Sequence, residues 1–239
     1  MITPHSKPSR VFDHAFTLLL AVAFPLFAKF YAFPRLLQGV AEGDPNARSG
    51  MYAMTIVIQW TLVAVLAFAW RRFGRTAPML GLSRPRGWRL VVTVVLPLVA
   101  VALLTIQNVA IATQPAVREH LQDEMAEVAG LVPHTTSELG LFTALAITAG
   151  ICEEVLYRGF LVGYAARFMP AWVAVIVTSA VFGFGHWYQG VGNAAQTGVV
   201  GLIMGVIYLV TGSIGAPIAL HAIVDIAGGI SGWLAVRPG

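Results

Sequence analysis

Charged residues are scarce in this sequence. Only 11% of the 239 residues are Asp, Glu, Lys or Arg, whereas 57% are hydrophobic, and the mean hydropathy is +0.76. Because soluble domains carry about a quarter charged residues, this composition excludes an ordinary soluble domain and predicts an integral membrane protein. In a membrane protein, the formal net charge of +4 reflects an excess of Lys and Arg in the loops on one side of the membrane. We do not interpret it as a signal for nucleic-acid binding.

Cysteine is nearly absent as well. The single Cys152 excludes a disulfide within the chain and a zinc site built on several cysteines. The sequence contains no Gly-x-Ser-x-Gly elbow. Cys152 adjoins Glu153, but adjacent positions on a helix do not face each other. We therefore interpret Cys152 as a small packing residue and not as a nucleophile.

Long apolar runs, in contrast, are abundant. A helix that crosses the bilayer needs about 20 mostly apolar residues. The expected fold is all-α: a single integral membrane domain over residues 1–239, a polytopic transmembrane helix bundle of about seven to eight spans. Its core is formed by the last four spans, and the motif-bearing helices lie within residues 139–234. The predicted spans are 14–34, 51–70, 89–112, 139–163, 170–187, 195–212 and 214–234.

The loops predict an orientation. Basic residues gather before the first span, between the second and third, and between the fourth and fifth, which alternate crossings place on one side. The positive-inside rule makes that side cytoplasmic. The loop 113–138 on the opposite side is acidic, and residues 117–129 carry apolar residues at the spacing of an amphipathic surface helix. The cytoplasmic set is Lys7, Arg10, Arg71, Arg72, Arg75, Arg84, Arg86, Arg89 and Arg167; the exceptions on the other side are Lys29, Arg35 and Arg48.

Two acids lie side by side in the fourth span, within Gly150-Ile-Cys-Glu153-Glu154-Val-Leu-Tyr-Arg158. An ionisable residue inside a bilayer is costly and indicates a functional site. Neighbours on a helix point about 100° apart, so Glu153 and Glu154 are not expected to reach one target. Arg158 follows Glu154 by four residues and shares its face. We predict that Glu154 pairs with Arg158 while Glu153 faces the bundle interior.

Two later spans carry polar residues in apolar surroundings. Phe182-Gly-Phe-Gly-His186 ends the fifth span, and His221-Ala-Ile-Val-Asp225 lies in the seventh, where His221 and Asp225 share a helix face. Depths counted from the cytoplasmic ends at about 1.5 Å per residue agree within several ångströms. Glu153, His186, His221 and Asp225 are therefore expected to meet near the membrane midplane if their helices are neighbours.

Such a set of side chains fits the hydrolysis of a peptide bond in two ways. A carboxylate beside an imidazole takes a proton from water, and a second imidazole with a polar neighbour stabilises an oxyanion. Alternatively, Glu153, His186 and His221 match the ligands of a catalytic zinc or other divalent metal with one open position. The residues leave both the metal-free and the metal-assisted mechanism open.

Together the three stretches resemble the CPBP family of intramembrane proteases, which includes CAAX proteases and bacteriocin-processing proteins. The family motifs Glu-Glu-x-x-x-Arg, Phe-x-x-x-His and His-x-x-x-Asn/Asp are present here in that order, within about residues 139–230. The first half of the chain is similar only in being hydrophobic helix. The resemblance implies an endopeptidase related to type II CAAX prenyl endopeptidases, with a peptide or a lipidated or membrane-associated protein as substrate. The location expected is a bacterial cytoplasmic membrane, with the amino terminus in the cytoplasm and no nucleic-acid partner.

The resemblance also implies roles for single residues. Glu153 and His186 would activate the water, His221 and Asp225 would form the oxyanion site, and Glu154 and Arg158 would support it. Where members of the family have Asn at the position of Asp225, its side-chain amide donates a hydrogen bond. Because an ionised Asp cannot donate, Asp225 must be protonated, orient His221 or bind a metal.

Three other functions fit parts of the pattern. Some relatives are thought to be non-enzymatic scaffolds or immunity proteins. A b-type cytochrome would use His186 and His221 as axial haem ligands, but it would not need Glu153. A proton-coupled transporter would also use intramembrane acids and histidines, yet the sequence shows no inverted repeat of the kind common in transporters.

Overall fold

The computed structural model describes residues 7–237, and regular structure in this range is helical. Within these described residues, six helices are long and apolar enough to cross a membrane, which confirms the all-α transmembrane bundle. The elements are α1 (Lys7–Leu18), α2 (Phe24–Phe27), α3 (Phe33–Ala41), α4 (Ala47–Arg72), α5 (Trp88–Thr113), α6 (Pro115–Glu124), α7 (Thr136–Glu154), α8 (Val162–Ala165), α9 (Ala171–Gly185), α10 (Val191–Thr211) and α11 (Gly215–Val236).

Each predicted span overlaps at least one of these helices, and the fifth, 170–187, corresponds to α9, which is short for a crossing. The helix α9 has 15 residues, fewer than the roughly 20 that a full crossing needs. It ends at Gly185 because the chain then turns through a short 3₁₀ segment, Trp187–Gln189, to Gly190, whose φ of 101° suits glycine. His186 therefore lies at the end of a short helix, where the chain turns back into α10.

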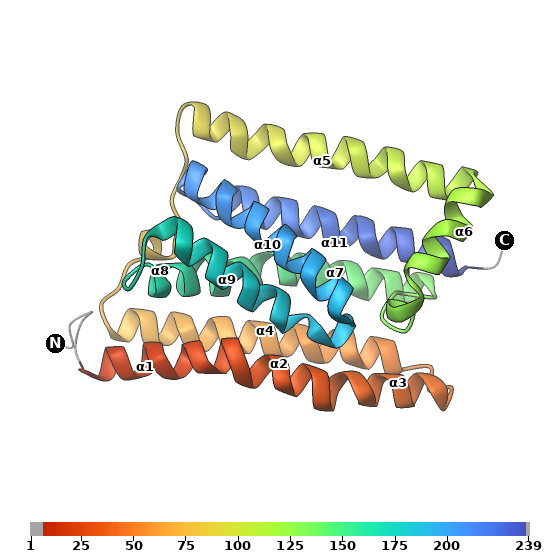
Figure 1. Ribbon diagram of the computed structural model, residues 1–239, viewed down its shortest axis with the longest axis horizontal. Helices are drawn as coiled ribbons and strands as arrows, with labels where there is room; N and C mark the ends of the chain where they lie inside the picture. Colours follow the sequence, from red (N-terminus) through yellow and green to blue (C-terminus); the bar gives the residue numbers. More distant parts are fainter. Residues whose placement is uncertain (1–6, 238–239) are drawn as a thin grey trace.

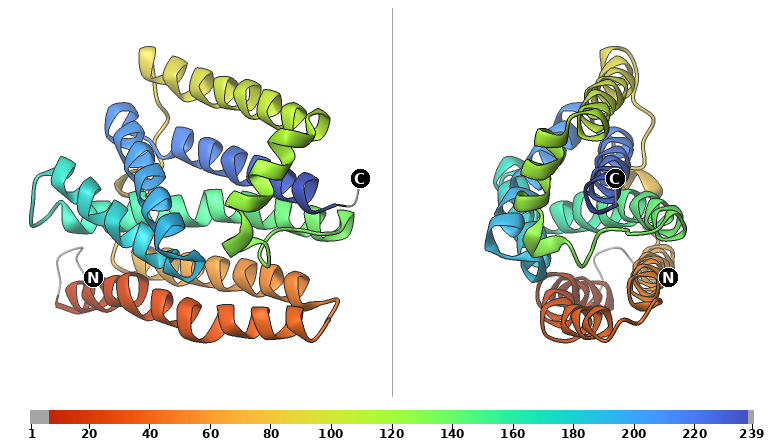
Figure 2. Two further views of the ribbon diagram at one scale, coloured as in Figure 1. Left: turned by 45° about the vertical axis from the view of Figure 1, so that its right-hand side comes forward. Right: turned by 90° about the vertical axis from the view of Figure 1, so that its right-hand side faces the viewer.

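The bundle is layered around α7. This helix packs between α4 and α11, α11 packs between α7 and α5, and α9 packs against α10. In Figure 1, α5 lies at one edge of the bundle and the chain of α1, α2 and α3 lies at the opposite edge. The end-on view in Figure 2 shows the same elongated arrangement, with α7 and α11 between the two edges. The motif-bearing helix α7 is thus central.

The first span is a single bent rod made of α1, α2 and α3 joined by π-helical turns at Leu19–Ala23 and Ala28–Ala32. Pro25 and Pro34 lie within the first two residues of α2 and α3. Proline has no N–H to donate, so widened turns next to it keep the helix continuous. A third π-helical segment, Val155–Leu161, follows Glu154 directly and contains Arg158.

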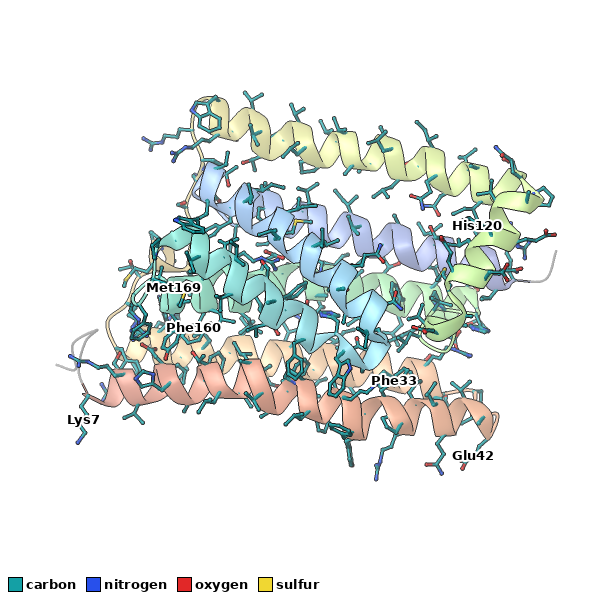
Figure 3. The ribbon with its side chains drawn as sticks, viewed as in Figure 1. Lys7, Phe33, Glu42, His120, Phe160 and Met169 are labelled. Atoms are coloured by element: carbon teal, nitrogen blue, oxygen red, sulfur yellow. The ribbon has the colours of Figure 1, made fainter. Side chains whose placement is uncertain are left out.

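The start of α1, the loop from the end of α4 to the start of α5, and the turn after α8, which carry the basic set, lie at one end of the bundle (Figure 1). In Figure 3, Lys7 lies at one end and Glu42 and His120 lie at the other. The loops that follow α4 and α8 return to the end of Lys7, and α6 crosses the opposite end at a steep angle to the bundle (Figure 1). The amphipathic helix expected over residues 117–129 is present as α6 and a short 3₁₀ turn, Ala126–Val128.

Candidate active site

The helix that carries both acids begins at a capping box. The Thr135 hydroxyl accepts a hydrogen bond from the Glu138 amide, and the Glu138 carboxylate accepts one from the Thr135 amide. This arrangement satisfies backbone donors that would otherwise be unpaired at the helix start. From there α7 runs without interruption to Glu153 and Glu154, which occupy its last turn.

Glu154 is the more enclosed acid, with 0% of its surface exposed. Its Oε1 accepts hydrogen bonds from Arg158 Nη1 at 2.7 Å and from His221 Nδ1 at 2.9 Å. The pairing of Glu154 with Arg158 predicted from their spacing is therefore present. Glu154 additionally contacts α11, so the same carboxylate holds both an arginine and a histidine of the motifs.

Arg158 links the site to two further helices. Its Nη2 donates to the carbonyl of Gly201 in α10 at 2.7 Å, and its guanidinium lies 4.8 Å from the centre of the Phe182 ring in α9. A Cβ on Gly201 would come within 2.9 Å of Phe182 and 3.3 Å of Arg158. The absence of a side chain at position 201 thus allows α10 to approach closely.

Glu153 lies between α4 and α11. Its Oε1 accepts a hydrogen bond from Gln59 Nε2 of α4 at 2.7 Å. Its Oε2 lies 3.8 Å from His221 Nε2 and is buried without a hydrogen-bond partner within the described chain. One oxygen of Glu153 is therefore held in place, and the other is left as an unused acceptor.

The His221 ring lies between carboxylates. Glu154 contacts its Nδ1, whereas Glu153 and Asp225 flank its Nε2, at 3.8 and 3.5 Å. The expectation that adjacent acids would not reach one target is wrong here. The two nitrogens lie on different sides of the imidazole, so a ring from α11 spans the angle between Glu153 and Glu154. Its helix comes close enough because Gly150 of α7 meets Ala222 without a Cβ of its own.

His186 approaches the site from the end of α9. Its Nδ1 is 2.9 Å from the Phe182 carbonyl, so Nδ1 carries the proton that it donates there and Nε2 remains the free nitrogen. His186, His221 and Asp225 all interact electrostatically with Glu153. Phe182 packs against both imidazoles, with ring centres 4.8 Å from His186 and 5.9 Å from His221. The structure thus brings the four predicted residues together.

Asp225 is the most open member of the group, with 36% of its side chain exposed. Its Oδ2 is 3.5 Å from His221 Nε2. Of the three roles open to a carboxyl group at this position, orienting His221 is the one that this contact favours. Cys152, next to Glu153, is fully buried, as expected of a packing residue.

Two residues of this region were missed in the sequence. Gln59 is the only amide in the apolar run 51–70, and a polar side chain within a span is itself a signal of function or of helix contact. Tyr188 follows His186, stacks against it at 6.1 Å and interacts electrostatically with Glu153 and Asp225. Burial raises the pKa of Tyr188 to about 12, although a hydrogen bond from Gln189 opposes the shift. The neutral phenol is therefore a hydrogen-bond donor near these acids.

The metal ligands considered in the sequence were Glu153, His186 and His221. Within residues 7–237, no group of three or more His, Cys, Asp and Glu side chains is arranged so that it could hold a metal ion. The donors are instead engaged with one another: His221 Nδ1 with Glu154, and Glu153 Oε1 with Gln59. The arrangement of these donors within residues 7–237 therefore does not fit a metal ion.

Comparison with known proteins identifies the same part of the chain. Residues 135–227 match the family model of the type II CAAX prenyl endopeptidase Rce1-like proteins. No curated protein and no solved structure matches the chain. The matched segment is less than half of the chain and contains Glu153, His186, His221 and Asp225, but not Gln59. Over this segment, which holds its three motifs, the chain is therefore similar to the type II CAAX prenyl endopeptidase Rce1-like family.

Proposed function

We propose that this protein hydrolyses a peptide bond within the membrane by means of a water molecule activated by Glu153 and His186, without a metal. The substrate is a peptide or a lipidated or membrane-associated protein. The observation that carries this proposal is the convergence of Glu153, His186, His221 and Asp225 from α7, α9 and α11. Its setting is a multi-pass membrane protein of a protease family.

Glu153 is suited to be the base. Gln59 holds Oε1, and Oε2 has no hydrogen-bond partner within the described residues. A water placed between Oε2 and the free Nε2 of His186 gives one proton to Glu153, and the resulting hydroxide forms a C–O bond with the scissile carbonyl carbon. Glu153 then passes this proton to the leaving amine as the C–N bond breaks. The balance is one water consumed and two peptide fragments released.

His221 is suited to stabilise the oxyanion. Its Nδ1 proton is donated to Glu154, so a second proton on Nε2 makes the ring an imidazolium that donates to the developing negative charge. Asp225 lies beside that nitrogen and orients it. Arg158, which is bonded to Glu154 and to the Gly201 carbonyl, keeps this chain of contacts in place.

Cleavage of a defined peptide tests the proposal. Purified protein in liposomes is incubated with a proteome-derived peptide library and, separately, with a CAAX-type peptide with and without a prenyl group, and the products are identified by mass spectrometry. Glu153→Ala and His186→Ala are expected to abolish every cleavage that the wild type makes. If either variant still cut the same bond, the proposed roles would be wrong.

The same preparations distinguish the other functions considered. A b-type cytochrome would show a Soret band, whereas both nitrogens of His221 here face carboxylates. If the protein were a scaffold or an immunity protein, its Glu153→Ala variant would still restore the phenotype of a deletion strain. We expect no Soret band and no restoration, because the proposed activity depends on the Glu153 carboxylate.

A further inference from the structure

Gln59 is a polar residue in an apolar helix outside the segment that matches the protease family. It lies in the middle of α4, and the residues from 51 to 70 contain no charged side chain. Only 4% of Gln59 is exposed. Burying an amide away from water costs free energy unless the group is hydrogen-bonded, so the contacts of this side chain indicate why it is tolerated.

The contacts of Gln59 point to the acid. Its Nε2 donates to Glu153 Oε1 at 2.7 Å, whereas its own Oε1 is buried without a hydrogen-bond partner in the described part of the chain. If Gln59 served only to join α4 and α7, an apolar side chain would do so without leaving a buried carbonyl oxygen unpaired. A hydrogen bond to an ionised carboxylate is stronger than one between neutral groups.

The hydrogen bond also decides which oxygen of Glu153 is available. With Oε1 occupied by Gln59, Oε2 is the oxygen that lies 3.8 Å from His221 Nε2. The titratable groups that interact with Glu153 come from α7 and the π-helical segment after it, from α11, and from the end of α9 and the turn that follows it: Cys152, Glu154, Tyr157, His186, Tyr188, His221 and Asp225. Gln59 therefore contributes a neutral donor from α4 to a carboxylate otherwise surrounded by titratable groups.

We infer that Gln59 is a positioning residue of the peptidase: its amide fixes Glu153 Oε1, so that Oε2 alone receives the proton of the attacking water. The inference rests on the proposed role of Glu153 as the base. It extends the functional site to α4, in the half of the chain that lies outside the matched segment 135–227. Gln59 acts on the acid and not on the substrate.

Replacement of the amide by an apolar side chain of similar size tests this role. For the library peptide that the wild type cleaves best, Gln59→Leu should lower kcat about 10- to 100-fold, the effect of losing a hydrogen bond to a charged group. KM should stay unchanged. The acid limb of the kcat–pH profile should move to higher pH, because a carboxylate that loses a donor retains its proton more strongly.

A matched control exists one residue away. Trp60 Nε1 donates to Thr148 Oγ1 at 3.3 Å, which is a second hydrogen bond between α4 and α7. Trp60→Phe removes that bond without touching Glu153 and should leave kcat and its pH profile unchanged. If Gln59→Leu behaved like Trp60→Phe, or if both variants lost activity with the same pH profile as the wild type, Gln59 would be only a structural link.

The Glu153→Ala variant separates this inference from the proposed function. If Glu153→Ala retained cleavage, the proposed base would be wrong and the role of Gln59 would fall with it. If Glu153→Ala were inactive and Gln59→Leu had a normal kcat, only the inference about Gln59 would be overturned. Thermal unfolding of each variant, followed by tryptophan fluorescence, verifies that the compared proteins are folded.

Discussion

Two clusters of buried acids and arginines in this bundle are built in opposite ways. At the end of the bundle that carries Lys7, one acid, Asp13, meets two arginines. Arg75 binds both of its oxygens at 2.8 Å, and Arg167 binds Oδ2 at 2.8 Å. In the candidate active site, two adjacent acids have one arginine near them, Arg158, and it binds Glu154 and not Glu153.

The two clusters differ in whether every carboxylate oxygen accepts a hydrogen bond. Both oxygens of Asp13 accept hydrogen bonds, whereas Glu153 Oε2 and Glu154 Oε2 are buried without a partner within residues 7–237. An unpaired buried acceptor is costly, and natural proteins retain such costs mainly where function needs them. The comparison predicts that the Asp13 cluster supports stability and that the Glu153 cluster supports chemistry.

The largest expected effect is on activity, from Glu153→Gln. The amide has nearly the shape of the carboxylate but cannot take a proton from water, so cleavage should fall by about 10³-fold or more. The unfolding temperature should stay the same or rise, because an unpaired charge is removed from the interior. Peptide cleavage and thermal unfolding in the same detergent measure both quantities. A clear loss of stability with cleavage intact would show that Glu153 supports the fold and not the chemistry.

Asp13→Ala should have the converse effect. It leaves Arg75 and Arg167 without their shared carboxylate, and breaking a buried ion pair by removing one partner costs about 3–5 kcal/mol. The unfolding temperature should fall markedly, while kcat of the protein that remains folded should change less than about twofold because the cluster lies outside the site. An unfolding temperature equal to that of the wild type would show that this cluster does not stabilise the bundle.

Asp225→Asn should have a small effect. In the proposed mechanism Asp225 orients His221 from the side, where its Oδ2 lies 3.5 Å from Nε2, and an amide oxygen can accept the same hydrogen bond. We expect kcat within about tenfold of the wild type, the range of one neutral hydrogen bond. A loss as large as that of Glu153→Gln would instead make the Asp225 carboxylate essential, as a proton donor or a metal ligand.

The smallest expected effect is that of metal removal. Because the proposed water is activated by Glu153 and His186, dialysis against a chelator should leave cleavage unchanged within about twofold. The measurement is the initial rate before and after dialysis, with metal analysis of the same samples. A loss of activity that added Zn²⁺ restored would favour the metal-assisted mechanism, with Glu153, His186 and His221 rearranged as ligands.

Local spacing was sufficient for part of this site. Glu154 and Arg158 are four residues apart, as are His221 and Asp225, and both pairs are in contact because side chains at this spacing share a helix face. The capping box that begins α7 can also be read from Thr135 and Glu138. Hydropathy located most spans because a helix that crosses a membrane needs a long apolar run.

Contacts between different helices could not be predicted from local spacing. Gln59 and Glu153 are 94 positions apart and His221 and Glu154 are 67 apart, and no periodicity relates such pairs. The fifth predicted span, 170–187, has nearly the bounds of α9, but the tight turn at Gly190, which brings α10 back at Val191, was not predicted.

The sequence by itself therefore determined that this protein is an all-helical membrane bundle and which acids and histidines are candidates for its site, because composition and helical spacing are local properties. Only the tertiary structure decided how those residues share their partners. It placed the ring of His221 between two neighbouring acids and added Gln59 to one of them. The physical reason is that these arrangements depend on how closely α4, α7 and α11 pack, and packing is set by the whole bundle.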